Sequence, residues 1–349
     1  MNPLTLSAEA VLATPLYEPE AVFGDDPAAL RSTYAALAKR WHTDVNKHPQ
    51  AQAVMAHIVA LHGAAKEKVA RGTYTPVGTL QLKAKDGKAY RLRYLKRHPF
   101  ELGTMYISEK QVVFCVQSKF KPLYANALKV IKGLTFANDK MQAEMKPRLP
   151  NIKAAFETDD ECVLVMHKDA ELVLLRDLLN HEKGQVEHRH VAWMLRRFLS
   201  HACYLNFAGL AHNAISPDTY FVSPEHHYGA LLGGWWYAAP LGGTLTHLPT
   251  RTAALAPSDV IRNKKADARV DLELVRAMGR ELLGDLGGST LIGRKDIPKP
   301  LVDWLRQPTS GKGVTDLKTF EEHVLPKSYG PRRFAKWSVK PTDIYQPRS

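Results

Sequence analysis

The order of strand-like and helix-like segments is the feature that most constrains the fold of this chain. Two segments, ELGTMYIS at 101–108 and QVVFCVQSKF at 111–120, are rich in β-branched and aromatic residues around a polar turn, which predicts two strands. A strand hairpin is predicted again at 153–168. Apolar residues recur with helical spacing in four segments, at 122–134, 139–152, 171–180 and 187–208. A small sheet followed by a helical region predicts an α+β fold with two lobes.

Composition restricts the classes of function. The chain has 349 residues and a formal net charge of +13, which favours acidic partners such as nucleic acid, acidic proteins or an anionic surface. The three cysteines, Cys115, Cys162 and Cys203, are far apart and form no CxxC pair, so we expect neither a disulfide framework nor a metal site. We expect a cytoplasmic protein, and no membrane association, because no apolar run approaches the roughly 20 residues of a spanning helix.

The segment before the sheet predicts a helical head at 1–72. A first helix is predicted to start at Pro27 behind Asp26, and a second to follow the loop HTDVNKHPQ. Their apolar stripes are Leu30, Tyr34, Leu37 and Trp41, and then Val54, Ile58 and Leu61. Two antiparallel helices joined by a short loop form an αα-hairpin.

The loop of this head has a further resemblance. YAALAKRWHTDVN resembles the basic helix and His-Pro-Asp loop of DnaJ-type J domains, which dock on a heat-shock chaperone and stimulate its ATPase. His42 and Asp44 match the motif, but Thr43 replaces its proline, which would restrain the backbone. The resemblance implies a partner-binding surface that adds three basic helix residues, Arg31, Lys39 and Arg40. The alternative is that the two helices only pack against the rest of the chain.

Residues 79–97 predict a β-hairpin that turns at Asp86-Gly87. Alternation places its apolar residues on one face and four cations on the other; the cations are Lys83, Lys85, Arg91 and Arg93. These cations are candidate phosphate contacts for nucleic acid. A solvated edge protected by lysines is the other interpretation.

After the head and hairpin, most of the chain resembles the eukaryotic-like protein kinase fold, in which a β-rich lobe precedes a helical one. The motifs that carry this resemblance are LGTMYI, RLPNI, CVLVMHK, HNAISPDTYFV, GALLGGWW, LAPSDVI and ADARVDLELVRAMGRELLGD. They resemble the glycine loop, the entry to the fourth strand, the hinge, the catalytic loop, the metal-binding segment, the A-P-E motif and the helix that opens with an aspartate. The resemblance implies lobes at 73–168 and 169–330, followed by a basic extended tail at 331–349.

Three positions of this resemblance lack the groups that phosphoryl transfer needs. Kinases hold the substrate hydroxyl with an aspartate and their magnesium ions with an asparagine and a second aspartate. The resemblance aligns these with Ala214, with Thr219, and with Gly233 or its neighbour Gly234. None of the four carries a carboxylate or an amide. We therefore expect no catalysis.

The resemblance also implies a weak nucleotide site. Its candidates are Gly103 in the glycine loop, Gln117 where the strand lysine would lie, Lys119 nearby, and Glu144 as the helical partner. We expect no bound cofactor, with ATP as the alternative.

The scaffold positions of the family are retained. The resemblance implies that His212 anchors the loop, that Pro217 shapes its turn, and that Asp271, at the start of a buried helix, binds backbone N–H groups of the loop.

These features favour a pseudokinase-like adaptor that acts by binding proteins, either a heat-shock chaperone or another protein. The alternative is a basic protein associated with nucleic acid, and a third reading is an atypical active kinase or a true co-chaperone. The combination also resembles uncharacterised proteins of tailed bacteriophages, for which the location would be the host cytoplasm. This last point is an analogy at the level of fold.

Overall fold

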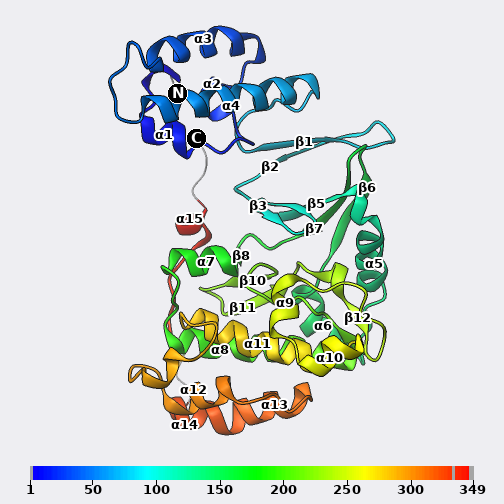
Figure 1. Cartoon of the computed structure of the whole chain (residues 1–349). Coiled ribbons are helices and arrows are strands. Elements are labelled where there is room, and N and C mark those ends of the chain that lie inside the picture. Colours follow the sequence, from blue (N-terminus) through cyan, green and yellow to red (C-terminus); the bar gives the residue numbers. More distant parts are fainter. Residues whose placement is uncertain (1–2, 332–334, 346–349) are drawn as a thin grey trace.

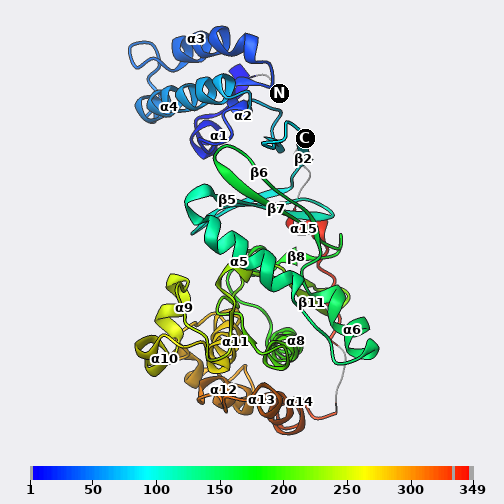
Figure 2. The ribbon, with the colours of Figure 1, turned by 90° about the vertical axis from the view of Figure 1, so that its right-hand side faces the viewer.

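The computed structural model describes residues 3–331 and 335–345, and it has three parts in a row. Figure 1 shows a helical head in blue above a β-sheet in cyan and green, with a helical body below. The same order is seen after a quarter turn in Figure 2. The α+β class predicted from the order of segments is confirmed. No helix among the described residues is long and apolar enough to cross a lipid bilayer.

The head consists of four helices, α1 (Ala8–Ala13), α2 (Glu20–Phe23), α3 (Leu30–Trp41) and α4 (Ala51–Ala70). The predicted start is confirmed, because Asp26 Oδ1 accepts a hydrogen bond from Ala28 N at 2.9 Å and begins a short 3-10 turn that leads into α3. The predicted loop at 42–50 separates α3 from α4. The head has its own hydrophobic core, which contains Leu37, Trp41, Val54, Ile58 and Leu61.

The predicted hairpin is confirmed as β1 (Thr79–Lys83) and β2 (Ala89–Arg93). Its turn depends on Gly87, which has a φ of +87°, and on Asp86, whose Oδ1 accepts a bond from Lys88 N at 3.1 Å. Its apolar face forms one cluster with a face of the main sheet, made of Leu80, Leu92, Tyr94, Val113, Cys115, Val163 and Val165. The hairpin therefore covers the outer face of that sheet.

The main sheet has five antiparallel strands in the order β3-β4-β5-β7-β6. These are β3 (Lys96–Phe100), β4 (Gly103–Ile107), β5 (Gln111–Gln117), β6 (Ile152–Glu157) and β7 (Glu161–His167). Strand β3 was not predicted, because KRHPF has no β-branched residue and contains Pro99. Proline is tolerated there because β3 is the edge of the sheet.

Two helices connect β5 to β6. Helix α5 (Lys121–Lys132) lies where a helix was predicted, and the Tyr124 hydroxyl donates to Val163 O at 3.0 Å, which ties the helix to β7. Helix α6 (Asp139–Met145) is shorter than predicted, because Pro147 and Pro150 follow it.

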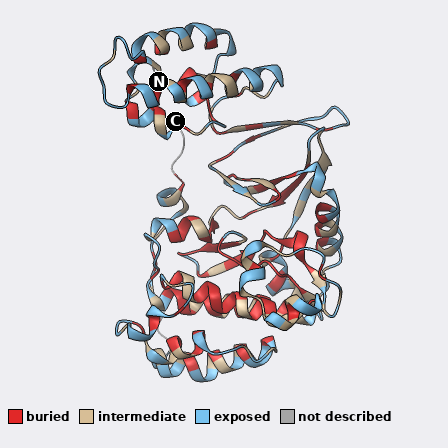
Figure 3. Ribbon diagram, in the orientation of Figure 1, coloured by how far each residue is buried: buried red, intermediate tan, exposed pale blue. Residues whose placement is uncertain are grey.

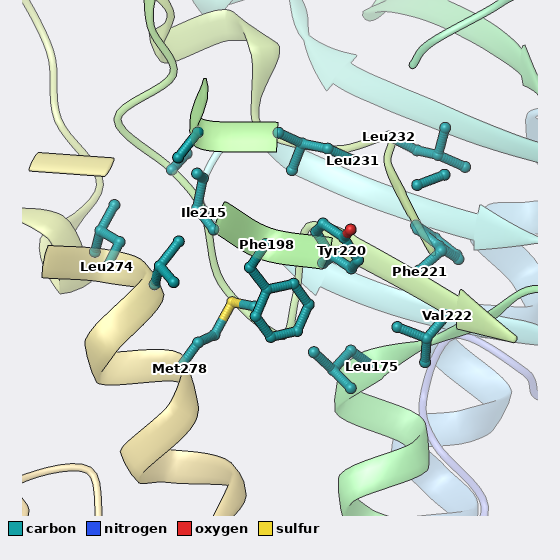
Figure 4. Close-up of a cluster of buried hydrophobic side chains, with 14 of the residues drawn as sticks. Leu175, Phe198, Ile215, Tyr220, Phe221, Val222, Leu231, Leu232, Leu274 and Met278 are labelled. Atoms are coloured by element: carbon teal, nitrogen blue, oxygen red, sulfur yellow. The ribbon is translucent and has the colours of Figure 1, made fainter. Parts of the chain in front are cut away.

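The helical body is built around α8 (His188–Phe207) and α11 (Ala268–Leu282). The predicted helix at 171–180 is wrong in its first part, because Val173–Leu174 form strand β8 before α7 (Leu175–His181) begins. Strand β8 pairs with β10 (Tyr220–Ser223), which pairs with β11 (Tyr228–Leu231). Helix α8 packs against these strands, where the Phe198 ring meets Tyr220 edge-on at 4.6 Å. Figure 4 shows these two side chains in the buried cluster, together with Leu274 and Met278 of α11 and Leu175 of α7.

The remaining elements of the body are short. The helices are α9 (Thr250–Leu255), α10 (Ser258–Asn263), α12 (Lys299–Arg306), α13 (Gly313–Thr319), α14 (Leu325–Tyr329) and α15 (Pro341–Ile344). The strands are β9 (Leu210–Ala211) and β12 (Ala239–Pro240). The 3-10 turns of the body are η5 (Trp235–Tyr237) and η6 (Thr290–Gly293), and η7 (Phe320–Val324) is a π-helical turn. The head contains η1 (Pro3–Thr5) and η2 (Pro27–Ala29), and η3 (Ser118–Phe120) and η4 (Lys146–Arg148) lie between β5 and β6. Figure 3 shows the buried residues concentrated in the sheet and around α8 and α11, and one hydrophobic cluster joins both regions.

The head contacts the sheet through the segment between α1 and α2. The Arg97 guanidinium of β3 lies 3.8 Å from the centre of the Tyr17 ring, and the Tyr94 hydroxyl donates to Glu18 Oε1 at 2.8 Å. Glu20 is also buried, and it pairs with Lys68 of α4. Two buried carboxylates therefore lie at the base of the head, each with a partner.

The predicted tail at 331–349 falls partly on residues 332–334 and 346–349, which lie outside the described residues. Its described part packs on the body. The Trp337 ring stacks on His190 of α8 at 4.2 Å, and the Tyr345 hydroxyl accepts a bond from Leu174 N at 2.8 Å and donates to Asp177 Oδ2 at 3.0 Å.

Candidate functional site

The loop at 209–219 joins α8 to β10 and is held from below by Asp271. This carboxylate, at the start of α11, accepts a hydrogen bond from His212 N at 2.7 Å and another from Asn213 N at 2.8 Å. Burial raises the pKa of Asp271 to about 7, although the two N–H donors act in the opposite direction. This is the contact that the sequence analysis expects of Asp271.

Asn213 fixes the backbone beside this contact. Its φ is +61°, a left-handed conformation that asparagine tolerates better than most residues. Its side chain donates to Ala211 O at 3.2 Å and to Tyr237 O at 3.0 Å, and its own carbonyl accepts a bond from Thr252 Oγ1 at 2.7 Å. The bonds of Asn213 therefore tie the loop to two other segments of the body, in addition to Asp271.

His212 connects the loop to the glycines that follow β11. Its Nε2 donates to Gly233 O at 3.1 Å, and its ring meets Trp235 edge-on at 4.8 Å. Burial lowers its pKa to about 3, so the imidazole is neutral at pH 7. Pro217 is also buried, and its carbonyl accepts a bond from Arg176 N at 2.9 Å at the start of α7.

The three positions expected to lack catalytic groups, two in this loop and one after β11, come together at one cavity. Ala214, Thr219, Gly233 and Gly234 line one cavity of about 250 Å³ between the sheet and the body. Thr219 Oγ1 donates to Ala214 O at 2.7 Å and accepts from Ser216 N at 3.0 Å, so its hydroxyl is used within the loop.

The two glycines leave no space for a side chain. A Cβ atom on Gly234 would lie 2.7 Å from His212 Cε1 and 2.8 Å from Ala214 Cβ, and the φ of +84° disfavours any other residue. A Cβ atom on Gly233 would lie 3.1 Å from Thr219 Cα. A carboxylate at Gly234 would therefore require the loop to move.

Asp218 is the carboxylate of this loop that borders the cavity, and it is bound to an arginine. Arg176 donates to its two oxygens from Nε and Nη2, at 2.9 Å each, and from Nη1 to Glu281 Oε1 at 2.8 Å. Arg251 pairs with the same glutamate. The hydrogen bond to Asp218 is the main cause that raises the pKa of Arg176. This network neutralises the mouth of the cavity.

Aromatic rings fill the space between the sheet and the loop. Trp236 stacks on Phe100 of β3 at 5.4 Å and meets Phe114 of β5 edge-on at 4.9 Å. Its carbonyl accepts a bond from Asn126 Nδ2 of α5 at 3.0 Å. The motif GALLGGWW contains Trp236, but the role of Phe100 and Phe114 depends on which strands pair, and no local pattern reveals that.

A carboxylate closes the turn between β3 and β4 onto the body. Glu101 Oε2 accepts a bond from the Tyr237 hydroxyl at 3.0 Å, and Oε1 accepts one from Thr250 N at 3.0 Å. In addition, His98 of β3 lies 2.9 Å from Asp177 of α7. The sheet is thus held against the body on both sides of the aromatic cluster.

None of the four nucleotide-site candidates lines this cavity. Gly103 lies within β4, where a Cβ atom would lie 2.0 Å from Cys115 O, so the glycine permits strand packing. Glu144 is exposed and pairs with Arg148 at 3.5 Å, and the Lys119 ammonium lies over the Phe120 ring.

The strand position that faces the cavity is Phe114, which corrects the assignment to Gln117. Successive residues of a strand face opposite sides. Val113 and Cys115 face the hairpin, and Gln117 has the same parity. Even-numbered residues of β5 belong to the core shared with the body. The β5 residue on the cavity side is therefore Phe114, and not the residue that the resemblance aligns with the nucleotide-binding lysine of kinases.

The head presents its candidate residues to solvent. The side chains of His42 and Asp44 are 52% and 84% exposed, and His42 Nδ1 lies 3.5 Å from Asp44 Oδ2. Thr43, Arg31 and Lys39 are exposed as well. The exposed Arg40 binds Leu4 O and lies over the Trp41 ring at 5.2 Å.

The hairpin cations divide into two groups. Lys83, Arg91 and Arg93 are exposed on the face away from the sheet. Lys85 does not join them, because it lies beyond β1 and pairs with Glu157 of β6 at 3.2 Å. The expectation of four cations on one face is wrong for Lys85.

Comparison with known proteins does not identify the chain. No protein-family model matches it, and no curated protein matches it.

Proposed function

We propose that this protein is a non-catalytic adaptor with a pseudokinase-like body and a J-like head, acting by protein–protein contact. The observation that carries the proposal is the cavity above Asp271. Its three expected catalytic or metal positions hold an alanine, a threonine whose hydroxyl bonds within the loop, and a glycine at either Gly233 or Gly234. Magnesium-dependent phosphoryl transfer needs carboxylate or amide oxygens at those positions.

Two further observations support a kinase-like body. The antiparallel strand order β3-β4-β5-β7-β6 follows the chain except for one exchange, and a helix, α5, crosses between β5 and β6. Asp271 binds the loop backbone as the resemblance implies. The contacts that shape the loop are therefore kept, although the groups that would act on a phosphate are not. A body that keeps the kinase-like loop contacts but lacks the catalytic groups is consistent with a protein that binds partners and does not transfer phosphate.

Catalysis tests this proposal directly. Purified full-length protein with magnesium and labelled ATP should give neither autophosphorylation nor transfer to a generic protein substrate. A ligand at a hundred times its dissociation constant raises the free energy of unfolding by about 2.7 kcal/mol. Because we expect no tight ATP binding, ATP should shift the melting temperature little. Magnesium-dependent transfer that is lost in Thr219→Ala would overturn the proposal.

A second candidate, nucleic-acid binding, rests on the exposed hairpin cations Lys83 and Arg91. A capture experiment from cell lysate, with and without nuclease, separates the two. Protein partners that persist after nuclease treatment support the adaptor. Partners that disappear with nuclease, and that also weaken in Lys83→Gln/Arg91→Gln, support nucleic-acid binding.

A further inference from the structure

Three metal-ligating side chains come together beside the small sheet of the body. This sheet consists of β8, β10 and β11, and it lies below the main sheet in Figure 1. Glu171 lies two residues before β8, whereas Glu225 and His226 belong to the turn between β10 and β11. One carboxylate oxygen of each glutamate and one ring nitrogen of the histidine all lie within 4.8 Å of one another. We call these three residues the turn cluster.

Strand pairing explains why these residues, far apart in the sequence, meet. Strands β8 and β10 are antiparallel, with Leu174 opposite Phe221 and Val173 opposite Val222. Continuing this register past the start of β8 brings Glu171 to the turn that follows β10. The expectation of no metal site rests on the spacing of the cysteines, so it does not bear on this group.

Buried hydrogen bonds fix the loop that carries Glu171. Lys168 Nζ donates to Asp169 O at 3.0 Å and to Leu172 O at 2.8 Å, and the Lys168 side chain is buried. The ammonium therefore binds the loop backbone from inside, while the Glu171 side chain is 46% exposed. A ligand on a backbone that is already held loses little freedom when it binds an ion.

The turn that carries Glu225 and His226 is held as well. His226 N donates to Ser223 Oγ at 3.3 Å. His227 has a φ of +52°, and its buried ring stacks on Trp193 of α8 at 4.7 Å. His227 thus anchors the turn in the body, whereas the His226 side chain is 53% exposed.

The turn cluster is locally acidic in a chain whose formal net charge is +13. Within residues 3–331 and 335–345, Glu171 pairs only with His226, at 3.8 Å between Oε2 and Nε2, and Glu225 has no ion pair. The pKa of the nearby Tyr228 hydroxyl is raised, first by burial and then by the charges of Asp169 and Glu171. One imidazole cannot neutralise two carboxylates in either protonation state. The cluster therefore attracts a cation.

The types of ligand select which cation. Carboxylates and imidazole both bind zinc, at about 2.0–2.2 Å from the ion. Ligands at these distances in a tetrahedral site lie about 3.4 Å from one another, so the 3.8 Å between His226 and Glu171 needs only a small side-chain adjustment. Calcium and magnesium prefer oxygen ligands alone. The imidazole therefore favours zinc over both.

We propose that the turn cluster binds one Zn²⁺ ion through Glu171, Glu225 and His226, with the remaining position open to water. The ion joins the loop before β8 to the turn between β10 and β11. The site is independent of the adaptor function, because it uses neither the cavity above Asp271 nor the head.

Calorimetric titration of the full-length protein, first freed of metal with EDTA, tests the assignment with Zn²⁺ and with Mg²⁺ as probes. We expect the tightest site to take one Zn²⁺ ion per chain, and we expect Mg²⁺ to bind at least about tenfold more weakly. Zn²⁺ should also raise the melting temperature, because an ion that binds only the folded chain stabilises it.

Two variants remove the ligands. His226→Gln and the double variant Glu171→Gln/Glu225→Gln should each weaken Zn²⁺ binding by about a hundredfold or more, because changes to residues that only orient a ligand already cost about 10–100-fold. The melting temperature of the metal-free protein should stay the same in both, because none of the three side chains is buried.

His247→Gln is the matched control, because His247 is exposed in the segment before α9 and the change is the same. It should leave Zn²⁺ binding unchanged. The assignment is overturned if Zn²⁺ does not bind, or if His226→Gln binds it as tightly as the wild type. It is also overturned if His247→Gln weakens binding equally, since binding would then be spread over surface histidines, or if Mg²⁺ binds as tightly as Zn²⁺.

Discussion

The two loops that carry the resemblances, 209–219 in the body and 42–50 in the head, differ in how they are held. The body loop is mostly buried; Asp271 and Thr252 bind its backbone, and Tyr237 O accepts a bond from the Asn213 side chain, all from positions distant in sequence. The head loop is mostly exposed, and its bonds are local, such as Asn46 N to His42 O at 2.8 Å. Changes in the body loop should therefore affect stability, whereas changes in the head loop should affect only binding.

The largest effect is expected at the buried carboxylate. Asp271→Ala leaves two loop N–H groups unpaired, and each costs about 1–3 kcal/mol, so the free energy of unfolding should fall by about 2 kcal/mol or more. Chemical denaturation measures it. Asp218→Ala, at an exposed ion pair, should cost less than about 1 kcal/mol. Equal losses in the two variants would contradict the difference between buried and exposed contacts.

The next effect is steric. Gly234→Ala places a methyl group against His212 and Ala214, and such overpacking costs about 1–3 kcal/mol. Gly242→Ala is the control, because Gly242 has a similar φ of +76° but nothing within 4 Å of its Cβ position. Thermal unfolding of both variants separates backbone strain from crowding. If Gly242→Ala loses as much stability as Gly234→Ala, the loss comes from the positive φ alone, and crowding against His212 and Ala214 contributes nothing.

A pH effect of intermediate size follows from the raised pKa of Asp271, about 7 in the folded protein. Because the folded protein holds this proton more tightly than the unfolded chain does, the contribution to stability is fully present below about pH 4 and is lost as the pH rises through 7. The lowered pKa of His212 acts in the opposite direction, since stability is lost as the pH falls below about 6.5. Subtracting the stability profile of Asp271→Asn from that of the wild type isolates the first contribution. A flat difference between pH 4 and 7 would show that the carboxyl does not titrate there.

The smallest effect on stability is expected in the head. His42→Gln and Thr43→Pro should each change the free energy of unfolding by less than about 0.5 kcal/mol, because both side chains are exposed. Their effect should appear only with a partner. The full-length protein should stimulate the ATPase of a heat-shock chaperone weakly, Thr43→Pro should raise this stimulation, and His42→Gln should abolish it.

The head experiment has two informative failures. Strong stimulation by the unmodified protein would make it a working co-chaperone. No stimulation even with Thr43→Pro would leave the head as a structural element.

Local patterns were sufficient where one segment determines its own structure. The loop between α3 and α4 follows from the break in helical spacing, the start at Pro27 follows from the Asp26 cap, and the turn at Asp86-Gly87 follows from turn chemistry. The contact of Asp271 also follows from a motif. The packing of the cavity does not, because it depends on which strand residues share a face and which strands are neighbours.

Phe114 and Lys85 illustrate that limit. Whether an apolar strand residue faces the hairpin or the body changes with a shift of one position, and β5 is apolar on both faces. Lys85 lies just after a strand, where alternation no longer fixes its direction, and its partner Glu157 is 72 residues away. Such pairings arise from the tertiary arrangement alone.

The buried Glu18 has a consequence for how this architecture can be inherited. Its partner Tyr94 directly follows β2 of the hairpin. Arg97, whose guanidinium lies over the Tyr17 ring, belongs to β3. A recombination event that transferred only residues 1–72 to another protein would separate the Glu18 carboxylate from the Tyr94 hydroxyl. The unit that can be exchanged between proteins is therefore the head together with the hairpin and the first edge of the sheet.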